Sequence, residues 1–342
     1  MKLRFAVLGT GFWARYQIPG WLEAGDVELV ALYNRTRSKA EAVSARFGGR
    51  VYDNVEALLD AEELDFVDII TDVDTHRAFA EQALRRGLDV VCQKPLAPSF
   101  GEAKQLVDFA TRSGARLFVN ENFRWQAPLR RVRALMADGV IGDVFKARIS
   151  FCSAFPVFEN QPFLAQLDRF ILTDIGSHVL DICRFLLGEV ETLYCRTARV
   201  NPGIRGEDVA TVLMHMRSGA HCIAEMSYAS IREREVFPQT LLLIEGAAGS
   251  IRLGPGFEVT VTTRKGSTKE IVRPRMYDWV DPDYAVVHSS IVDAQRDILG
   301  GLRGGEAETT GADNLETVRL VWASYASAEA NCTIELSRFP AL

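Results

Sequence analysis

The sequence lacks several features that would place the protein in a specialised class. No apolar run reaches the ~20 residues that span a bilayer, and the run that ends at Gly9 is too short for a secretory leader. Basic residues form no block longer than Arg130-Arg131-x-Arg133, and the formal net charge is -6. Nucleic-acid binders normally carry a basic face, so we expect no nucleic-acid partner. The lack of a long apolar run leads us to expect a cytoplasmic protein with no membrane partner.

Cysteine is sparse, repeats are absent, and no tract is of low complexity. The six cysteines are scattered among 342 residues without a C-x-x-C pair. Several lie in apolar surroundings, such as Cys92 and Cys183, which favours reduced, buried thiols over disulfides or a zinc site. With 48% hydrophobic and 25% charged residues, the chain has the composition and length of two packed domains.

The first third of the sequence alternates short apolar runs with helical patterns. We expect buried strands at 3–8, 27–33, 64–70, 88–91 and 117–119. We expect helices between them at 12–24, 38–47, 75–86 and 100–113. This alternation predicts βαβ units and a parallel sheet. Residues 1–121 are therefore expected to form a doubly wound α/β domain that binds a dinucleotide.

The rest of the chain has a different pattern. Helices are expected at 126–138, 174–187, 286–302 and 312–331. Strands, several of them joined by glycine-containing turns, are expected at 147–153, 192–199, 210–216, 220–228, 239–245, 249–253 and 258–263. Such turns between alternating runs are typical of antiparallel pairing. Residues 122–342 are therefore predicted to form an α+β domain on a mainly antiparallel sheet.

A glycine-rich turn follows the first expected strand. Residues 9–14 read G-x-G-x-x-A and lie between that strand and the first expected helix. Gly9 suits a tight turn, Gly11 lets the backbone approach a pyrophosphate, and Ala14 lets the helix pack closely on the sheet. This context predicts a dinucleotide site.

The end of the second expected strand bears on the choice of cofactor. An acidic residue there binds the adenosine ribose and repels a 2′-phosphate, whereas this chain has Asn34-Arg35-Thr36-Arg37. Asn34 can still bind a ribose hydroxyl, Arg35 can stack on adenine, and Arg37 can help to hold a phosphate. The sequence leaves NAD and NADP open.

Lys94, in Gln93-Lys94-Pro95, follows a strand at the carboxyl edge of the sheet, where ligands of such folds bind. Its ammonium can hold a substrate hydroxyl and stabilise a developing alkoxide. A lysine at the end of a strand can equally be a solvated cation, and local sequence does not separate the two interpretations.

An Asp/His pair lies on a later expected helix. In Asp174-Ile175-Gly176-Ser177-His178 the carboxylate and the imidazole are four residues apart, hence on one helical face. A histidine suits the removal of a hydroxyl proton while hydride leaves carbon. Two other interpretations stay open: an N-cap Asp174 with an unrelated His178, or a metal site that includes Asp181. Hydride transfer to a nicotinamide needs no metal, so we expect none.

Polar and aromatic residues near the domain junction are candidates for substrate contacts. Asn122 and Arg124 follow the last strand of the first domain and are suited to binding hydroxyls. The loop before Asp174 adds Phe163 and Arg169. Aromatic residues in such places are more often loop anchors.

These motifs together resemble the Gfo/Idh/MocA family. The resemblance rests on G-x-G-x-x-A, on Lys94-Pro95 and on D-x-G-x-H in that order, with further matches at 72–76 and 139–144. It covers nearly the whole chain. Gln93 replaces the usual Glu before the lysine, and Asp72 stands where the family often has Pro.

The family implies an NAD(P)-dependent oxidoreductase of small sugars or polyols, similar overall to bacterial aldose dehydrogenases. It implies a catalytic group of Lys94, Asp174 and His178. It also implies cofactor contacts from Gly9, Gly11, Phe12, Trp13, Asn34, Arg35, Arg37, Thr71, Val73, His76, Gln93 and Lys94. Many members associate through the second-domain sheet, so we expect a homodimer or homotetramer.

Two other functions stay open. Some relatives keep NAD bound and cleave glycosides by transient oxidation and elimination, with no net change in the cofactor. A catalytically silent relative could sense dinucleotide and regulate a partner, although such members are expected to lose the lysine or the histidine.

Overall fold

A computed structural model describes residues 2–339, which form two compact units. Unit 1 runs to Asn122 and adds Tyr277–Asp281 and His288–Val318. Unit 2 comprises Phe123–Met276, Pro282–Val287 and the chain from Arg319 onward. Within the described chain, no helix has the length and apolar character to cross a bilayer.

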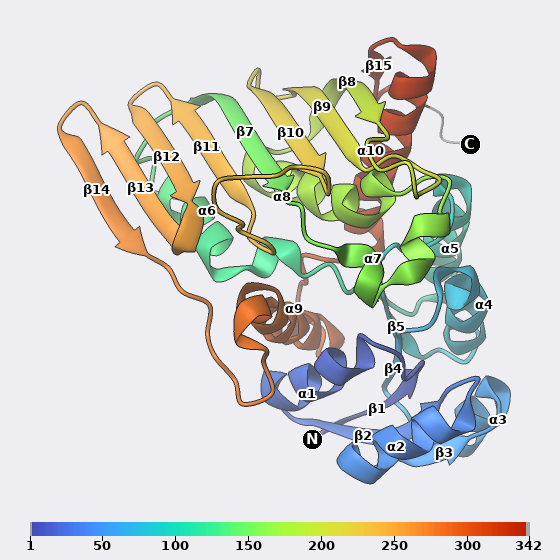
Figure 1. Cartoon of the computed structure of the whole chain (residues 1–342). Coiled ribbons are helices and arrows are strands. Elements are labelled where there is room, and N and C mark those ends of the chain that lie inside the picture. The colour runs from blue at the N-terminus through green and yellow to red at the C-terminus, as the bar shows by residue number, and fades with distance from the viewer. Residues whose placement is uncertain (1, 340–342) are drawn as a thin grey trace. The chain divides into compact units, whose positions relative to one another are not determined.

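Unit 1 is built on a six-stranded sheet in which all strands are parallel (Figure 1). Its order is β3 (Arg50–Tyr52), β2 (Val27–Tyr33), β1 (Leu3–Leu8), β4 (Phe66–Ile69), β5 (Asp89–Cys92) and β6 (Leu117–Val119). The helices between them are α1 (Ala14–Ala24), α2 (Arg37–Phe47), α3 (Val55–Ala61), α4 (Val73–Leu84) and α5 (Phe100–Ser113). The order reverses between β1 and β4, where doubly wound folds bind their ligands. The expected dinucleotide-binding fold is thus confirmed.

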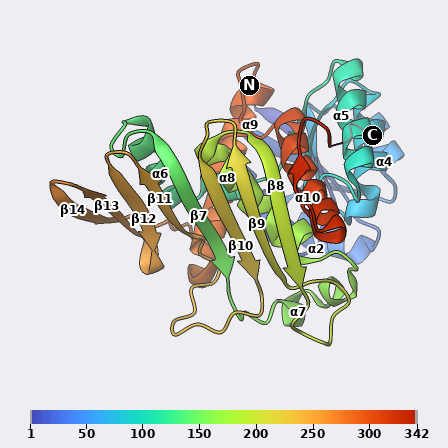
Figure 2. The same cartoon turned by 90° about the horizontal axis from the view of Figure 1, so that it is seen from above.

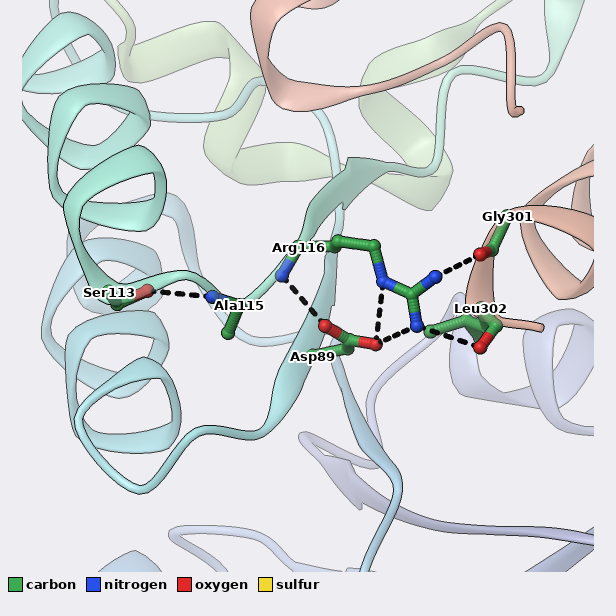
Figure 3. A network of polar contacts seen from close by, with 6 residues as sticks. All are labelled: Asp89, Ser113, Ala115, Arg116, Gly301 and Leu302. Carbon is green, nitrogen blue, oxygen red and sulfur yellow. Dashed lines mark hydrogen bonds and ion pairs between the residues drawn. The ribbon is translucent and has the colours of Figure 1, made fainter. Parts of the chain in front are cut away.

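Part of a late helix belongs to unit 1, although the sequence places it far from the first domain. Helix α9 (Ala285–Leu302) contributes Ile298, Leu299 and Leu302 to a buried cluster that includes Trp21 of α1. Arg116 holds its end: the guanidinium donates to Asp89 and to the carbonyl oxygens of Gly301 and Leu302 (Figure 3). The last carbonyls of a helix have no partner within it, so the arginine satisfies two of them.

This packing changes the expected division of the chain. We expected one boundary between residues 121 and 122, and unit 1 first ends at Asn122. Residues 277–281 and 288–318, which were expected in the second domain, also belong to unit 1. An amphipathic pattern predicts that one face of a helix is buried but does not tell which domain buries it.

Unit 2 is built on a nine-stranded, mainly antiparallel sheet, which Figure 2 follows from β14 to β8. Its order is β14 (Gly266–Ile271), β13 (Glu258–Thr263), β12 (Gly249–Gly254), β11 (Leu241–Gly246), β7 (Val144–Cys152), β10 (His221–Ser227), β9 (Val209–Met216), β8 (Val190–Ala198) and β15 (Ile334–Glu335). Only β7 and β10 pair in parallel among these described strands. The expected α+β architecture is confirmed.

Two helices cover one face of this sheet. Helix α8 (Ser177–Leu187) packs against β7 and β10, and α6 (Ala127–Ala137) packs against β12 (Figures 1 and 2). Alternate residues of β9 are buried and exposed, as a sheet with one covered face requires. The chain also contains α7 (Val157–Asn160) and α10 (Gly311–Ala330). The expected strands and helices match the observed ones to within a few residues, whereas β3, α3, α7, β14 and β15 were not expected.

The cysteines are free thiols. Four of them, Cys92, Cys183, Cys195 and Cys222, are buried, and burial raises the pKa of the first three thiols. These three thiols are therefore protonated and act as small apolar side chains.

Candidate functional site

The glycine-rich turn joins β1 to α1 at the carboxyl edge of the unit 1 sheet. Gly9 has φ 104°, and a Cβ there would lie 2.6 Å from the carbonyl oxygen of Ile70. A Cβ at Gly11 would meet no protein atom within 4 Å. The first position therefore requires glycine for its backbone, and the second borders open space.

This turn fits a pyrophosphate group. The Thr10 side-chain oxygen is buried and has no hydrogen-bond partner among the described residues. Trp13, the N-cap residue of α1, makes no side-chain capping bond. The N-terminal N–H groups of a helix attract anions, and an unpartnered hydroxyl beside them adds a donor. Phe12, which precedes Trp13, is exposed.

The predicted ribose residues have partners within the protein. The Asn34 side chain accepts from the Thr10 N–H at 3.0 Å and donates to the Thr36 carbonyl oxygen at 3.0 Å, so it ties the glycine turn to the end of β2. Arg37 pairs with Glu41 and Asp53, whereas Arg35 is largely exposed and lies 3.9 Å from Asp72. Only Arg35 of this group extends mainly into solvent.

His76 has a structural role in the protein, and its predicted cofactor contact stays a prediction. Its Nδ1 lies 3.1 Å from the Pro95 carbonyl oxygen and its Nε2 lies 3.0 Å from the Thr71 carbonyl oxygen. The ring is fully buried in α4, and burial lowers its pKa against the opposing effect of these carbonyls. His76 thus links the loop after β4 to the loop after β5. Val73, another predicted contact, opens α4.

Lys94 lies in the loop directly after β5, as expected. Its backbone N–H donates to the side-chain oxygen of Gln93 at 2.8 Å, and the Gln93 N–H donates to the Ile69 carbonyl oxygen. Gln93 therefore fixes the backbone at Lys94. The Lys94–Pro95 peptide bond is cis.

The Asp174 and His178 side chains belong to one continuous helical segment of unit 2. A π-helical turn (Leu172–Gly176) contains Asp174 and leads directly into α8, where His178 is buried in the first turn. The N-cap residue of the π turn is Ile171. Asp174 is therefore not an N-cap, while the catalytic role of His178 stays a prediction. Single π turns are frequent at functional sites.

A short 3-10 turn, η1 (Phe123–Trp125), packs on this segment. The Phe123 ring stacks on the His178 imidazole with centroids 3.7 Å apart and planes 6° apart. Arg124 donates from Nε at 2.7 Å and from Nη2 at 2.5 Å to the carboxylate of Asp181, and both residues are buried. Phe123 and Arg124 thus fix the side chains of His178 and Asp181 on α8.

The Arg124–Asp181 pair changes two expectations. Arg124 was a predicted substrate contact, but its guanidinium binds a carboxylate in its own unit. Asp181 was the third residue of the alternative metal site, and it is the acceptor in this pair. The described residues contain no cluster of three His, Cys, Asp or Glu side chains that could hold a metal ion.

The other predicted substrate contacts are dispersed. Asn122 donates to Ser290 of α9 at 2.7 Å, within unit 1. Arg169 pairs with Glu329 and lies over the rings of Trp322 and Tyr325, whereas Phe163 is 60% exposed. We therefore no longer propose Arg124 and Arg169 as substrate contacts.

The structure adds residues that the sequence did not single out. Tyr228 follows β10, and burial raises the pKa of its phenol, with a further contribution from the charge of Asp174. Glu207 accepts hydrogen bonds from the start of the π turn. Both lie more than 30 residues from Asp174, and no local motif marks either of them.

Comparison with known proteins assigns both parts of the chain. Residues 3–121 match the model of an oxidoreductase family with an NAD-binding Rossmann fold, and residues 129–252 match the GFO/IDH/MocA C-terminal domain.

Three similar proteins cover almost the whole chain. The D-apiose dehydrogenase of Paraburkholderia graminis is 41% identical over 99% of this chain and 91% of its own length. That of Rhizobium rhizogenes is 41% identical over 98% of each chain. An oxidoreductase from Agrobacterium radiobacter, crystallised with NAD+, L-tartaric acid and magnesium, is 40% identical and superposes with a TM-score of 0.97 over 99% of this chain and 100% of its own.

Proposed function

Because this chain belongs to the Gfo/Idh/MocA family of NAD-binding oxidoreductases, we propose that it oxidises a hydroxylated carbon of a small aldose, with D-apiose as the first candidate. The oxidoreductase class and the nicotinamide cofactor expected from the sequence are confirmed. The substrate, its reactive carbon and the roles of individual residues are proposals.

One observation carries the choice of substrate. Two relatives that are 41% identical over 98% or more of this chain are D-apiose dehydrogenases. Four further relatives, named as enzymes of inositol or of glucose derivatives, are 24–32% identical to this chain. Lys94, Asp174 and His178 stand in the motifs on which the family resemblance rests, and their catalytic roles are part of this proposal.

The chemistry follows from the side chains. Bound NAD supplies the acceptor for a hydride. A base must take the hydroxyl proton as the C–H bond breaks, and we assign this to a ring nitrogen of His178. The Phe123 stack fixes the plane of the imidazole, in which both ring nitrogens form their hydrogen bonds. The Lys94 ammonium donates to the substrate oxygen and stabilises its negative charge, and Asp174 orients the imidazole or the substrate.

Charges at the end of β2 favour NAD over NADP. Glu41 and Asp53 occupy the Arg37 guanidinium, and Asp72 lies 3.9 Å from Arg35. A 2′-phosphate must compete with these carboxylates for both arginines. We expect kcat/KM with NAD to exceed that with NADP at least tenfold, or about 1.4 kcal/mol.

The initial rate of cofactor reduction with each dinucleotide measures this preference. The double variant Glu41→Gln/Asp53→Asn removes the carboxylates that pair with Arg37, so the ratio of kcat/KM with NAD to that with NADP should fall. Glu63→Gln removes a distant, exposed partner of Arg4 and should leave this ratio unchanged. A wild-type enzyme that prefers NADP contradicts the assignment.

A substrate panel tests the proposed activity. Purified protein is incubated with NAD and with aldoses, polyols, hydroxy acids and glycosides, including D-apiose, myo-inositol and L-tartrate, and both the absorbance of reduced cofactor and the release of free sugar are followed. Reduction with D-apiose at the highest kcat/KM supports the proposal. A higher value for another compound reassigns the substrate. Release of free sugar from glycosides without net reduction favours the elimination mechanism, and tight dinucleotide binding without turnover favours a regulator.

Two further expectations remain predictions. The exposed face of the unit 2 sheet is proposed to pair with a second copy, giving a homodimer or homotetramer, and sedimentation equilibrium measures its mass. The cytoplasmic location is supported by the sequence alone.

A further inference from the structure

Glu207 is connected to the helical segment that carries Asp174 and His178. Its side-chain oxygens accept from the N–H groups of Phe170 at 3.2 and 3.3 Å and from that of Leu172 at 3.3 Å. Its backbone carbonyl oxygen accepts from the Ile171 N–H at 3.1 Å. Three successive N–H groups, two just before the π turn and one at its first residue, therefore have the same residue as partner.

The helical segment has no cap of its own. Ile171, at the N-cap position, offers no side-chain acceptor. The first N–H groups of any helix need outside partners, and a carboxylate placed there also complements the helix dipole. Glu207, which lies in a loop more than 30 residues from Ile171 in the sequence, supplies both the hydrogen-bond acceptors and the negative charge.

Neighbouring residues hold the Glu207 carboxylate in place. The Tyr325 hydroxyl donates to it at 2.7 Å. A Cβ at Gly206 would lie 2.8 Å from the Leu167 carbonyl oxygen, so glycine permits this loop to approach the chain before the helix. Glu207 and Tyr325 are both buried.

We propose that Glu207 is a positioning residue: its buried carboxylate fixes the start of the π turn and thereby the orientation of Asp174 and His178. In this proposal it acts through the helical segment and not through contact with the substrate or the cofactor. This inference rests on the proposed function, because it concerns the residues to which we assign proton transfer. Tyr325 supports the carboxylate through its hydroxyl.

Kinetics on the full-length protein separate positioning from folding. We expect Glu207→Ala to lower kcat by about 100-fold, the order of loss that follows from a displaced catalytic group. The dissociation constant for NAD should not change, since the glycine turn lies in unit 1. Glu207→Gln keeps an oxygen acceptor for the N–H groups and should restore at least part of kcat, and Tyr325→Phe should give an intermediate loss.

Asp208 provides a matched control in the same loop. Its buried carboxylate accepts from the N–H groups of Val200 and Asn201, at 2.7 and 2.9 Å, and not from the helical segment. Asp208→Asn should lower thermal stability with kcat nearly unchanged. If Asp208→Asn and Glu207→Ala lose kcat in proportion to their loss of melting temperature, Glu207 is merely structural and the proposal is wrong.

A spectroscopic measurement tests the proposal without any substrate. The chain has five histidines, so a ¹⁵N-histidine-labelled sample gives a simple ring spectrum in which His178→Ala identifies the His178 signals. Those signals should shift in Glu207→Ala, with the His215 and His221 signals unchanged. Unchanged His178 signals overturn the proposal. If the panel yields no turnover while the His178 signals shift, the proposed function fails and the positioning role stands.

Discussion

Removal of the Lys94 ammonium is expected to lower kcat/KM for the aldose by about 10²–10³-fold, the usual loss when one donor to a developing oxyanion is deleted. Removal of the His178 imidazole should cost about 10²–10⁴-fold, the contribution of a positioned base. The steady-state rate of NADH formation with Lys94→Ala and His178→Ala measures both effects. NAD binding, followed by tryptophan fluorescence, should persist in both variants.

The double variant makes this prediction sharper. Groups that act in one step are strongly non-additive, so Lys94→Ala/His178→Ala should be little worse than the poorer single variant. Lys146→Ala and His215→Ala, which remove an exposed lysine and an exposed histidine from the unit 2 sheet, should retain wild-type rates. Independent losses that multiply in the double variant contradict a shared step.

Asp68→Asn is expected to stabilise the protein at neutral and alkaline pH. Asp68 is fully buried in β4, where its carboxylate accepts from Trp21 Nε1 at 2.7 Å and from Asn120 Nδ2 at 2.9 Å. Burial raises its pKa from 3.8 to about 7, although these two hydrogen bonds act in the opposite direction. The folded protein therefore binds this proton more tightly than the unfolded chain does.

The sign of the pH dependence follows from linkage. Because its pKa is raised in the folded state, the protonated Asp68 makes its full contribution to the free energy of unfolding below about pH 4. This contribution is lost as the pH rises through about 7. Three pKa units correspond to roughly 4 kcal/mol. The isosteric amide carries no charge, and a rotated Asn120 side chain can pair with it. The free energy of unfolding of the variant therefore does not fall in this pH range.

Denaturation by urea at a series of pH values measures the difference. The unfolding free energy of Asp68→Asn relative to the wild type should rise by several kcal/mol between pH 4.5 and 8.5. Asp60→Asn, at an exposed carboxylate paired with Arg86, should show no such trend. A flat difference for Asp68→Asn means that this carboxyl group titrates at its ordinary pKa, contrary to the account.

The sequence predicts elements whose pattern reflects burial. Strands β1 and β2 are mainly apolar and largely buried, so the sequence places them correctly. Strand β14 (Gly266–Ile271) is almost entirely exposed at an edge of its sheet, so no apolar alternation marks it. Strand β3 has only three residues, too few for a pattern.

The candidate site is predictable where its chemistry is local. Gly9, Gly11, Lys94 and the Asp174–His178 pair are found because each sits in a short motif. The residues that hold these side chains in place are not found from the sequence, because they come from distant segments that only packing brings close. The stack of Phe123 on His178 joins residues 55 positions apart, and the Glu207 cap comes from a loop beyond α8. Periodicity within a helix carries no information about either contact.

Transfer of deuterium from a perdeuterated aldose to NAD tests the central claim most directly. The sugar that turns over fastest is supplied with deuterium on every carbon, so the result does not depend on which carbon reacts. The account predicts reduced cofactor that is one deuterium heavier by mass spectrometry, in an amount equal to the oxidised sugar. Unlabelled or unreduced cofactor, alongside sugar that is consumed or released, contradicts it.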